Sequence, residues 1–275
     1  MKTFFEIIPD SYSEEDCLLV CEISNEGVSF CIKNEKEHKY IGVAVYGFDK
    51  NRPRSDFNHA FQMLFNTKPF LSRGYRKTTV VFSTSESTLI PFQMFDSTTA
   101  GDSLRLLYGD LISDCTALTD LVSEKGYFNS YRVRNDIYKI IEEQFPNRVS
   151  WHQYSLLLGR YSSEKNKMYI IFYSYKMVVT LFVDGKCHLI NTYDYQYAED
   201  VSYYLLALLQ QYNIENIFIE VSGFIEKDSS LYIELYKYFT DIDFASLPAF
   251  CEYSDEILHY PPHYFSHLFE LDPCG

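Results

Sequence analysis

The sequence lacks the cysteine and hydrophobic patterns of a secreted or membrane-spanning chain. Its seven cysteines are odd in number and include no C-x-x-C pair. Cys17 and Cys21 would lie about 13 Å apart on one strand, which is too far for a disulfide. The first 16 residues contain one Lys and turn acidic after a short apolar run, which is typical of neither a signal peptide nor a membrane span. We therefore expect reduced thiols, no direct membrane insertion and a cytoplasmic protein.

Positive charge is also scarce. The chain has 24 Lys and Arg against 38 Asp and Glu, a net charge of -14, and no basic run. A nucleic acid backbone would be repelled by this field, because binding it requires clustered Lys and Arg to neutralise phosphates. We expect no nucleic acid partner.

Motifs for nucleophilic catalysis are missing. There is no G-x-S-x-G sequence, and no cysteine has cationic neighbours that would lower its pKa. His263 and His267 have the H-x-x-x-H spacing of a metal pair if Pro261 or Pro262 opens a helix, so they are weak metal candidates. The zincin pattern needs Glu after the first His, where this chain has Tyr264. Alternatively, an aromatic stripe docks this tail onto the body, with the histidines at its margins.

Aromatic residues, in contrast, are abundant. The chain contains 25 Tyr and 22 Phe, and 47% of its residues are hydrophobic. Tyrosine in such numbers needs hydrogen-bond partners at core edges and interfaces. This composition favours a well-filled core and indicates large contact surfaces for protein partners.

The region from Met168 to Phe224 predicts three antiparallel strands, a helix and a fourth strand. Asp184-Gly185 is a strong hairpin signal between two of the strands. Val201, Leu205 and Leu208 fall on one face of the helix, and Glu199 and Asp200 would lie in its first turn. The expected strands are Met168–Ser174, Lys176–Val183, Cys187–Tyr193 and Asn216–Val221.

The same order of elements occurs earlier in the chain. With an offset of 150 residues, Ser24 falls on Ser174 and Val28 on Val178, and the strand breaks coincide. A helical stripe that includes Phe57 follows the third strand. The expected strands of this first copy are Cys17–Ser24, Val28–Asn34, Lys39–Gly47 and Thr78–Ser83.

Both copies continue with a strand, a helix and a short strand. In the first copy Tyr127–Val133 precedes the helix and Arg148–His152 follows it, and in the second the strands are Ile217–Val221 and Asp243–Leu247. The first copy holds about forty additional residues, Ser85–Gly126, which we interpret as an inserted subdomain.

This duplicated βββαβα unit with an insertion resembles the actin-like ATPases, whose two halves are each ribonuclease-H-like. The placement of the insert is most similar to the bacterial cell-division and type IV pilus assembly members. The whole chain, with Ile90–Asp96 (IPFQMFD) and Pro261–Leu271 (PPHYFSHLFEL), resembles an uncharacterised bacterial family, a domain of unknown function with an actin-like fold. The resemblance implies an α/β fold of two ribonuclease-H-like halves. We expect residues 1–160, with the insert at about 85–126, and residues 161–275, with an aromatic C-terminal tail.

The resemblance also implies where a nucleotide would bind. Actin-like ATPases hold phosphate with one hairpin per half, in which Gly lets backbone N–H groups approach and Asp serves the metal and water. The corresponding positions are Ser24, Asn25, Glu26 and Gly27 in the first half and Ser174, Tyr175 and Lys176 in the second. Neither hairpin contains Asp, and the second contains no Gly.

Other positions give little support for nucleotide chemistry. Ser222 and Gly223 resemble the adenosine-side motif of these ATPases, although one Gly after a strand is usually a turn. Lys176 could meet a phosphate, but we interpret it as a solvated turn residue that Glu26 could neutralise. A nuclease of the ribonuclease-H type would need clustered carboxylates, and Glu22 is the one candidate in the first copy, with Phe172 at the matching place in the second.

Two functions remain open from the sequence. The first is a non-catalytic scaffold or adaptor that binds protein partners through its insert or its aromatic surfaces, with no cofactor. The second is a divergent actin-like enzyme that binds or hydrolyses ATP with Mg. Binding of Mg-ATP distinguishes them.

Overall fold

The computed structural model describes residues 1–48, 54–110, 114–122 and 126–273. Within them the chain forms two compact units. One comprises residues 1–159, 250–257 and the chain from Leu271, and the other comprises residues 160–249 and 258–270. We expected two continuous segments that divide at residue 160. The division near 160 is present, but residues 250–257 and the chain from Leu271 belong to the first unit.

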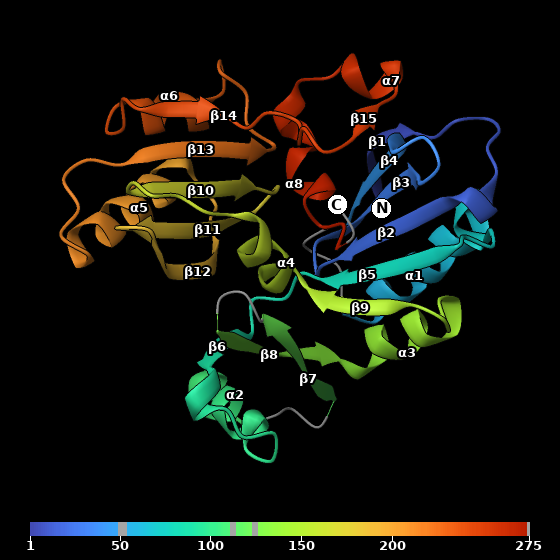
Figure 1. The fold of residues 1–275 in the computed structure, drawn as a ribbon, viewed down its shortest axis with the longest axis horizontal. Helices are drawn as coiled ribbons and strands as arrows, with labels where there is room; N and C mark the ends of the chain where they lie inside the picture. Colours follow the sequence, from blue (N-terminus) through green and yellow to red (C-terminus); the bar gives the residue numbers. More distant parts are fainter. Residues whose placement is uncertain (49–53, 111–113, 123–125, 274–275) are drawn as a thin grey trace. The chain divides into compact units, whose positions relative to one another are not determined.

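The first unit is built on a mixed sheet. Its central meander is formed by strands that are buried along almost their whole length, as expected for β-branched and aromatic runs. The strand order is β1-β4-β3-β2-β5-β9, and β15 also pairs with β4 (Figure 1). The strands are β1 (Lys2–Ile7), β2 (Cys17–Ile23), β3 (Gly27–Asn34), β4 (Lys39–Gly47), β5 (Lys77–Phe82), β9 (Val149–His152) and β15 (Glu252–Tyr253).

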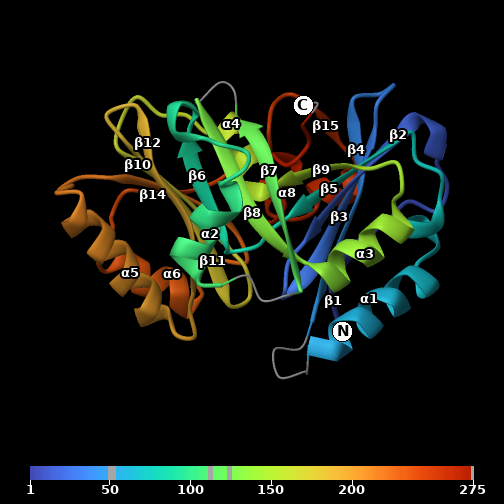
Figure 2. The ribbon, with the colours of Figure 1, turned by 90° about the horizontal axis from the view of Figure 1, so that it is seen from below.

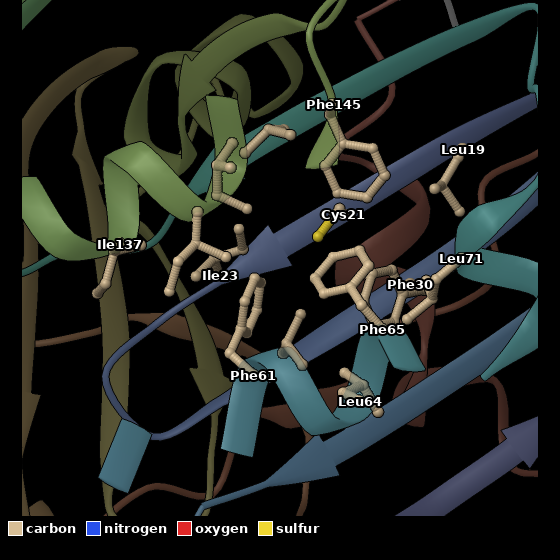
Figure 3. Packing of buried hydrophobic residues seen from close by; sticks show 14 of the residues in the cluster. Leu19, Cys21, Ile23, Phe30, Phe61, Leu64, Phe65, Leu71, Ile137 and Phe145 are labelled. Carbon is tan, nitrogen blue, oxygen red and sulfur yellow. The ribbon is translucent and has the colours of Figure 1, made fainter. Parts of the chain in front are cut away.

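Two helices cover one face of this sheet. Figure 2 shows α1 (Arg54–Thr67) and α3 (Asn135–Gln144) side by side below the strands. Side chains of β2 such as Cys21 and Ile23 meet Phe61 and Phe65 of α1 in a cluster that excludes water (Figure 3). The predicted helical stripe therefore packs against the first sheet.

The second unit repeats this plan and confirms the predicted three-stranded meander. Its sheet has the order β12-β11-β10-β13-β14, and α5 (Ala198–Gln211) and α6 (Ser230–Tyr236) contact each other (Figure 2). Asp184 and Gly185 both have positive φ, at 47° and 78°, as a two-residue hairpin turn requires. The strands are β10 (Lys167–Phe172), β11 (Lys176–Val183), β12 (Lys186–Asp194), β13 (Phe218–Gly223) and β14 (Ile242–Phe244).

The pairing registers correct the predicted offset between the two copies. Ile23 pairs with Val28 across the first hairpin and Phe172 with Met177 across the second, so the offset is 149 rather than 150. Ser24 therefore corresponds to Tyr173, not to Ser174. In the same way Glu22 corresponds to Ile171, not to Phe172. The two serines misled the comparison because they lie one position apart in otherwise equivalent turns.

The insert forms a separate three-stranded sheet with the order β6-β8-β7. Its strands are β6 (Ser87–Pro91), β7 (Cys115–Val122) and β8 (Tyr127–Arg134), and α2 (Ala100–Tyr108) packs on β8 and β6 (Figure 2). The predicted insert therefore ends too early at Gly126. Tyr127–Val133 belongs to the insert sheet, so its alignment with Ile217–Val221 is wrong. β5 is the counterpart of β13, as the predicted fourth strands of the two copies indicate.

The remaining helices are short. α4 (Gln153–Arg160) follows β9, and α7 (Asp255–Leu258) and α8 (Ser266–Phe269) lie in the C-terminal tail. Among the described helices, none combines the length and the apolar character that crossing a bilayer requires.

Candidate functional site

The first candidate hairpin is a tight turn closed by its own side chain. Ser24 N donates to Gly27 O over 3.0 Å, and Glu26 N donates to Ser24 Oγ over 3.2 Å. Gly27 is required for packing, because a Cβ there would lie 2.3 Å from the backbone oxygen of Tyr46 on β4. Close packing against β4 therefore explains why residue 27 is a glycine, without any role in phosphate binding.

A buried polar cluster lies where the strands of the first sheet end. The Glu22 carboxylate accepts a hydrogen bond from Gln153 Nε2 over 3.0 Å, and Ser83 Oγ donates to Gln153 Oε1 over 2.7 Å. All three residues are almost completely buried. The amide of Gln153 thus connects a strand-end carboxylate to a hydroxyl, which stabilises both polar groups away from water.

The second candidate hairpin is filled by bulky side chains. Tyr173 N donates to Lys176 O over 2.9 Å, and the Lys176 Nζ lies 4.9 Å from the centre of the Tyr173 ring. Lys176 is only 5% exposed, so its interpretation as a solvated turn residue is wrong. A cation held over an aromatic face is stabilised by the ring quadrupole, which accounts for part of its burial. Ser174 is half-buried and Tyr175 is exposed.

Gly223 lies where the second hairpin and the fourth strand of this unit meet. Its φ is +83°, and a Cβ would come within 2.1 Å of the backbone oxygen of Phe172. Phe224 N then donates to Phe172 O over 2.8 Å. Ser222 is buried beside it. The need for glycine here follows from backbone conformation and close approach.

The two tail histidines are buried rather than at the margins of the docked tail. His263 Nε2 donates to the backbone oxygen of Ile225 over 2.8 Å, and burial lowers the pKa of His263. The His267 ring meets the edge of Tyr173 with centroids 5.5 Å apart, and burial lowers the pKa of His267 to about 3. Both imidazoles are therefore neutral at physiological pH.

The predicted helix through both histidines is interrupted. A 3-10 turn (Pro262–Tyr264) is followed by α8, and Phe265 between them has φ -120° and ψ -10°. Phe265, Leu268 and Phe269 are buried, as expected for a tail that docks on the body. Within the described residues, no three His, Cys, Asp or Glu side chains are grouped as metal ligands would be.

The sequence did not reveal the role of Asp120 in the insert. Its Oδ2 accepts hydrogen bonds from His152 N over 2.6 Å and from Ser155 Oγ over 2.7 Å. Tyr131 OH donates to Oδ1 over 3.2 Å. Burial raises the pKa of Asp120, and these hydrogen bonds oppose that rise. The carboxylate thereby attaches β7 of the insert to β9 and α4. The sequence pattern that could have indicated this role is an acidic residue at an inward-facing position of an otherwise uncharged strand.

The insert also carries large apolar side chains exposed to solvent. Leu104 of α2 is buried, whereas Leu106 and Leu107 are 87% and 58% exposed. Met94 is 75% exposed and Leu121 of β7 is 50% exposed. We call Met94, Leu106, Leu107 and Leu121 the insert surface.

Comparison with solved structures places the chain in a structural class. It is similar to a Bacteroides thetaiotaomicron protein with an actin-like ATPase fold and unknown function, with 18% identity, 84% of this chain and 91% of that chain covered, and a TM-score of 0.73. It is also similar to a chain of the PilM–PilN type IV pilus biogenesis complex, with 10% identity, 95% and 100% covered, and a TM-score of 0.59. The fold is that of the actin-like ATPases, as the sequence resemblance implied.

The family follows from the sequence itself. Residues 10–242 match the model of a family described as protein of unknown function (DUF3822), and the chain belongs to this family. Comparison with curated proteins gives no match.

Proposed function

We propose that this protein is a non-catalytic cytoplasmic adaptor that binds other proteins through the insert surface. The observation that carries the proposal is the exposure of Leu106 and Leu107 on α2, a helix that packs on β8 and β6 and whose Leu104 is buried. Contiguous exposed apolar side chains are typical of interaction sites, and Leu106 and Leu107 are consecutive residues. The solved relative in a PilM–PilN complex is consistent with a binding role for this fold.

The second unit supports a role without nucleotide. In actin-like ATPases this hairpin would bind phosphate, which needs backbone N–H groups that are open to the ligand. Here Tyr173 is packed between Lys176 and the tail residue His267. The protein's own side chains therefore pack against the base of this hairpin.

One observation favours the alternative of an ATP-binding enzyme. Lys176 is a buried cation at the hairpin, and removal of water around a cation strengthens its attraction for phosphate. Calorimetry with Mg-ATP separates the two functions. The adaptor proposal expects no micromolar binding, whereas binding that Lys176→Ala abolishes would establish the alternative.

The interaction site is tested with matched leucine variants. We expect a double variant Leu106→Ser, Leu107→Ser to lose partner proteins that the parent protein captures from cells, while its thermal unfolding is unchanged. Leu206→Ser is the control, because Leu206 is also a helical leucine with 38% exposure but lies in the second unit. Equal loss of partners in both variants, or in neither, would contradict the assignment of binding to the insert.

A further inference from the structure

β7 of the insert has an open edge. Within the described part of the chain its one neighbouring strand is β8. Asn135 N donates to Asp114 O over 2.6 Å, which fixes the phase of the β7–β8 ladder. Since hydrogen-bonded pairs alternate in an antiparallel ladder, Thr116, Leu118 and Asp120 bond to β8 through their backbones. The backbone groups of the residues between them point away from β8. These residues are Ala117, Thr119 and Leu121.

The same three residues have exposed side chains. They lie on the face of the sheet opposite to Asp120, because side chains alternate along a strand. Helix α2 packs on β8 and β6 of the insert sheet. It does not cover Ala117, Thr119 and Leu121, which are exposed. One strip of β7 therefore offers both hydrogen-bonding groups and small or apolar side chains.

The strip is held in a fixed position from its other face. Asp120 accepts hydrogen bonds from His152 N, Ser155 Oγ and Tyr131 OH. A strand that is ordered before binding loses little conformational entropy when a partner adds to it. β7 also contains no Pro or Lys, the residues that commonly protect exposed edges, and its one charged side chain faces inward.

Charge indicates which segment fits this edge. Exposed carboxylates lie after β6, at Asp96, and just before β7, at Asp114, whereas Asp102 and Asp110 both lie within ion-pair distance of Arg105. The whole chain has a net charge of -14. A second copy of this acidic chain would be repelled, whereas a basic segment would be attracted.

We propose that β7 binds an extended, basic segment of a partner protein, which adds to the insert sheet as an antiparallel or parallel strand beside Ala117, Thr119 and Leu121. Main-chain hydrogen bonds would supply affinity and apolar side chains at alternate positions would contact Leu121. This inference rests on the proposed adaptor function and names the kind of partner segment that the insert takes.

The test uses amide hydrogen exchange of the full chain, followed by NMR. In the free protein the amides of Ala117, Thr119 and Leu121 should exchange faster than those of Thr116, Leu118 and Asp120. A synthetic peptide of ten residues in which valine alternates with lysine serves as the probe. We expect it to slow exchange at the three outward amides by at least about tenfold, and the matched valine–glutamate peptide to have no effect.

Thr119→Pro removes one outward N–H group without breaking a bond to β8, so the insert should remain folded. It should weaken binding of the valine–lysine peptide by about tenfold or more. Thr119→Val is the matched control, because it also loses the hydroxyl contact to Ser130 but keeps the N–H group. We expect it to bind the peptide as the parent does.

Several outcomes would overturn the inference. No peptide binding, binding without protection of the three amides, or equal binding by Thr119→Pro would reject strand addition. A dimer of this chain that forms with concentration and is lost in Thr119→Pro would replace the basic partner by a second copy. If cellular partners are lost in Leu106→Ser, Leu107→Ser but kept in Thr119→Pro, the adaptor function stands and strand addition at β7 is wrong.

Discussion

The two repeats share one backbone plan but differ at equivalent positions. Both sheets have a three-stranded meander, and in each the pairing of the second and third strands shifts register at the same place. The shift lies between Ile32 and Lys33 in β3 and between Leu181 and Phe182 in β11. At this bulge the first repeat buries Lys33 and the second buries Phe182. The comparison teaches that the strand order constrains the backbone more than it constrains the chemistry of the side chains.

The ends of the fourth strands show the same contrast. Phe82 ends β5 and Gly223 ends β13, and in both repeats the next backbone N–H donates to the end of the first strand over 2.8 Å. In the first repeat the strand residue before this N–H group is Phe82, whose large side chain is buried in the core. In the second repeat this residue is a glycine that brings two backbones together.

Among the substitutions considered, Gly223→Ala should destabilise the protein most. The new Cβ would meet the Phe172 carbonyl at 2.1 Å and the residue would keep a positive φ, so we expect a loss of at least about 4 kcal/mol in the free energy of unfolding. Gly185→Ala is the control, because its φ is +78° but its nearest neighbour is 3.9 Å away. It should cost only about 1 kcal/mol. Urea unfolding of both variants measures the difference, and similar losses would mean that close approach is unimportant.

The buried Lys33 in the first repeat depends on the C-terminal tail. Its Nζ donates to Asp272 Oδ2 over 2.7 Å, and Tyr40 OH donates to the same oxygen over 3.4 Å. Burial disfavours the charged ammonium, but the hydrogen bond and charge of Asp272 hold the pKa of Lys33 above its usual value. Asp272→Asn would leave the ammonium without an anion, and we expect a loss of about 3 kcal/mol.

A double-mutant cycle checks this interpretation. Lys33→Met approaches the apolar solution that the second repeat has at Phe182, so the variant with both Lys33→Met and Asp272→Asn should be more stable than Asp272→Asn alone by about 1 kcal/mol or more. Additive losses in urea unfolding would show that the ion pair does not couple the two residues.

The sequence predicted the succession of strands and helices along both repeats because the strands are buried and uninterrupted, with turn residues such as Asp184-Gly185 between them. It did not predict the exact offset between the repeats, since Ser24 and Ser174 were aligned by identity although strand pairing makes Ser24 correspond to Tyr173. It also gave no sign that Lys176 is buried, because the tail residue His267, which packs on the neighbouring Tyr173 ring, is brought to the hairpin by tertiary folding. The open edge of β7 likewise depends on which strands become neighbours.

Asp120→Asn should loosen the insert, a feature that the second repeat lacks. The amide has one oxygen where the carboxylate uses two, so one of the three donors loses its acceptor, and we expect a loss of about 2 kcal/mol near pH 5. Asp110→Asn is the control, because it changes an exposed carboxylate of the same insert.

The pH dependence of this loss has a defined sign. Because the pKa of Asp120 is raised in the folded state, the folded protein binds its proton more tightly than the unfolded chain. Between the usual aspartate pKa and the raised value, stability from this group falls as pH rises. The difference between the parent and Asp120→Asn should therefore shrink with rising pH, and urea unfolding at several pH values would reveal a wrong sign as a growing difference.

The smallest effect at neutral pH is expected from His267, which belongs to the tail that closes the hairpin of the second repeat. Its pKa of about 3 in the folded state lies below that of an unfolded histidine, so the unfolded chain gains a proton first as pH falls below about 6.5. The parent should lose about 2 kcal/mol of stability from this group between pH 7 and pH 5. His267→Leu keeps a buried apolar contact with Tyr173 and removes the titration, so its stability should match the parent near pH 7 and exceed it by about 2 kcal/mol at pH 5. His259→Leu controls for removal of an exposed histidine from the same tail. If the parent and His267→Leu showed parallel pH profiles in urea unfolding, water would have to reach His267. The tail would then not bury His267 against Tyr173 of the second hairpin.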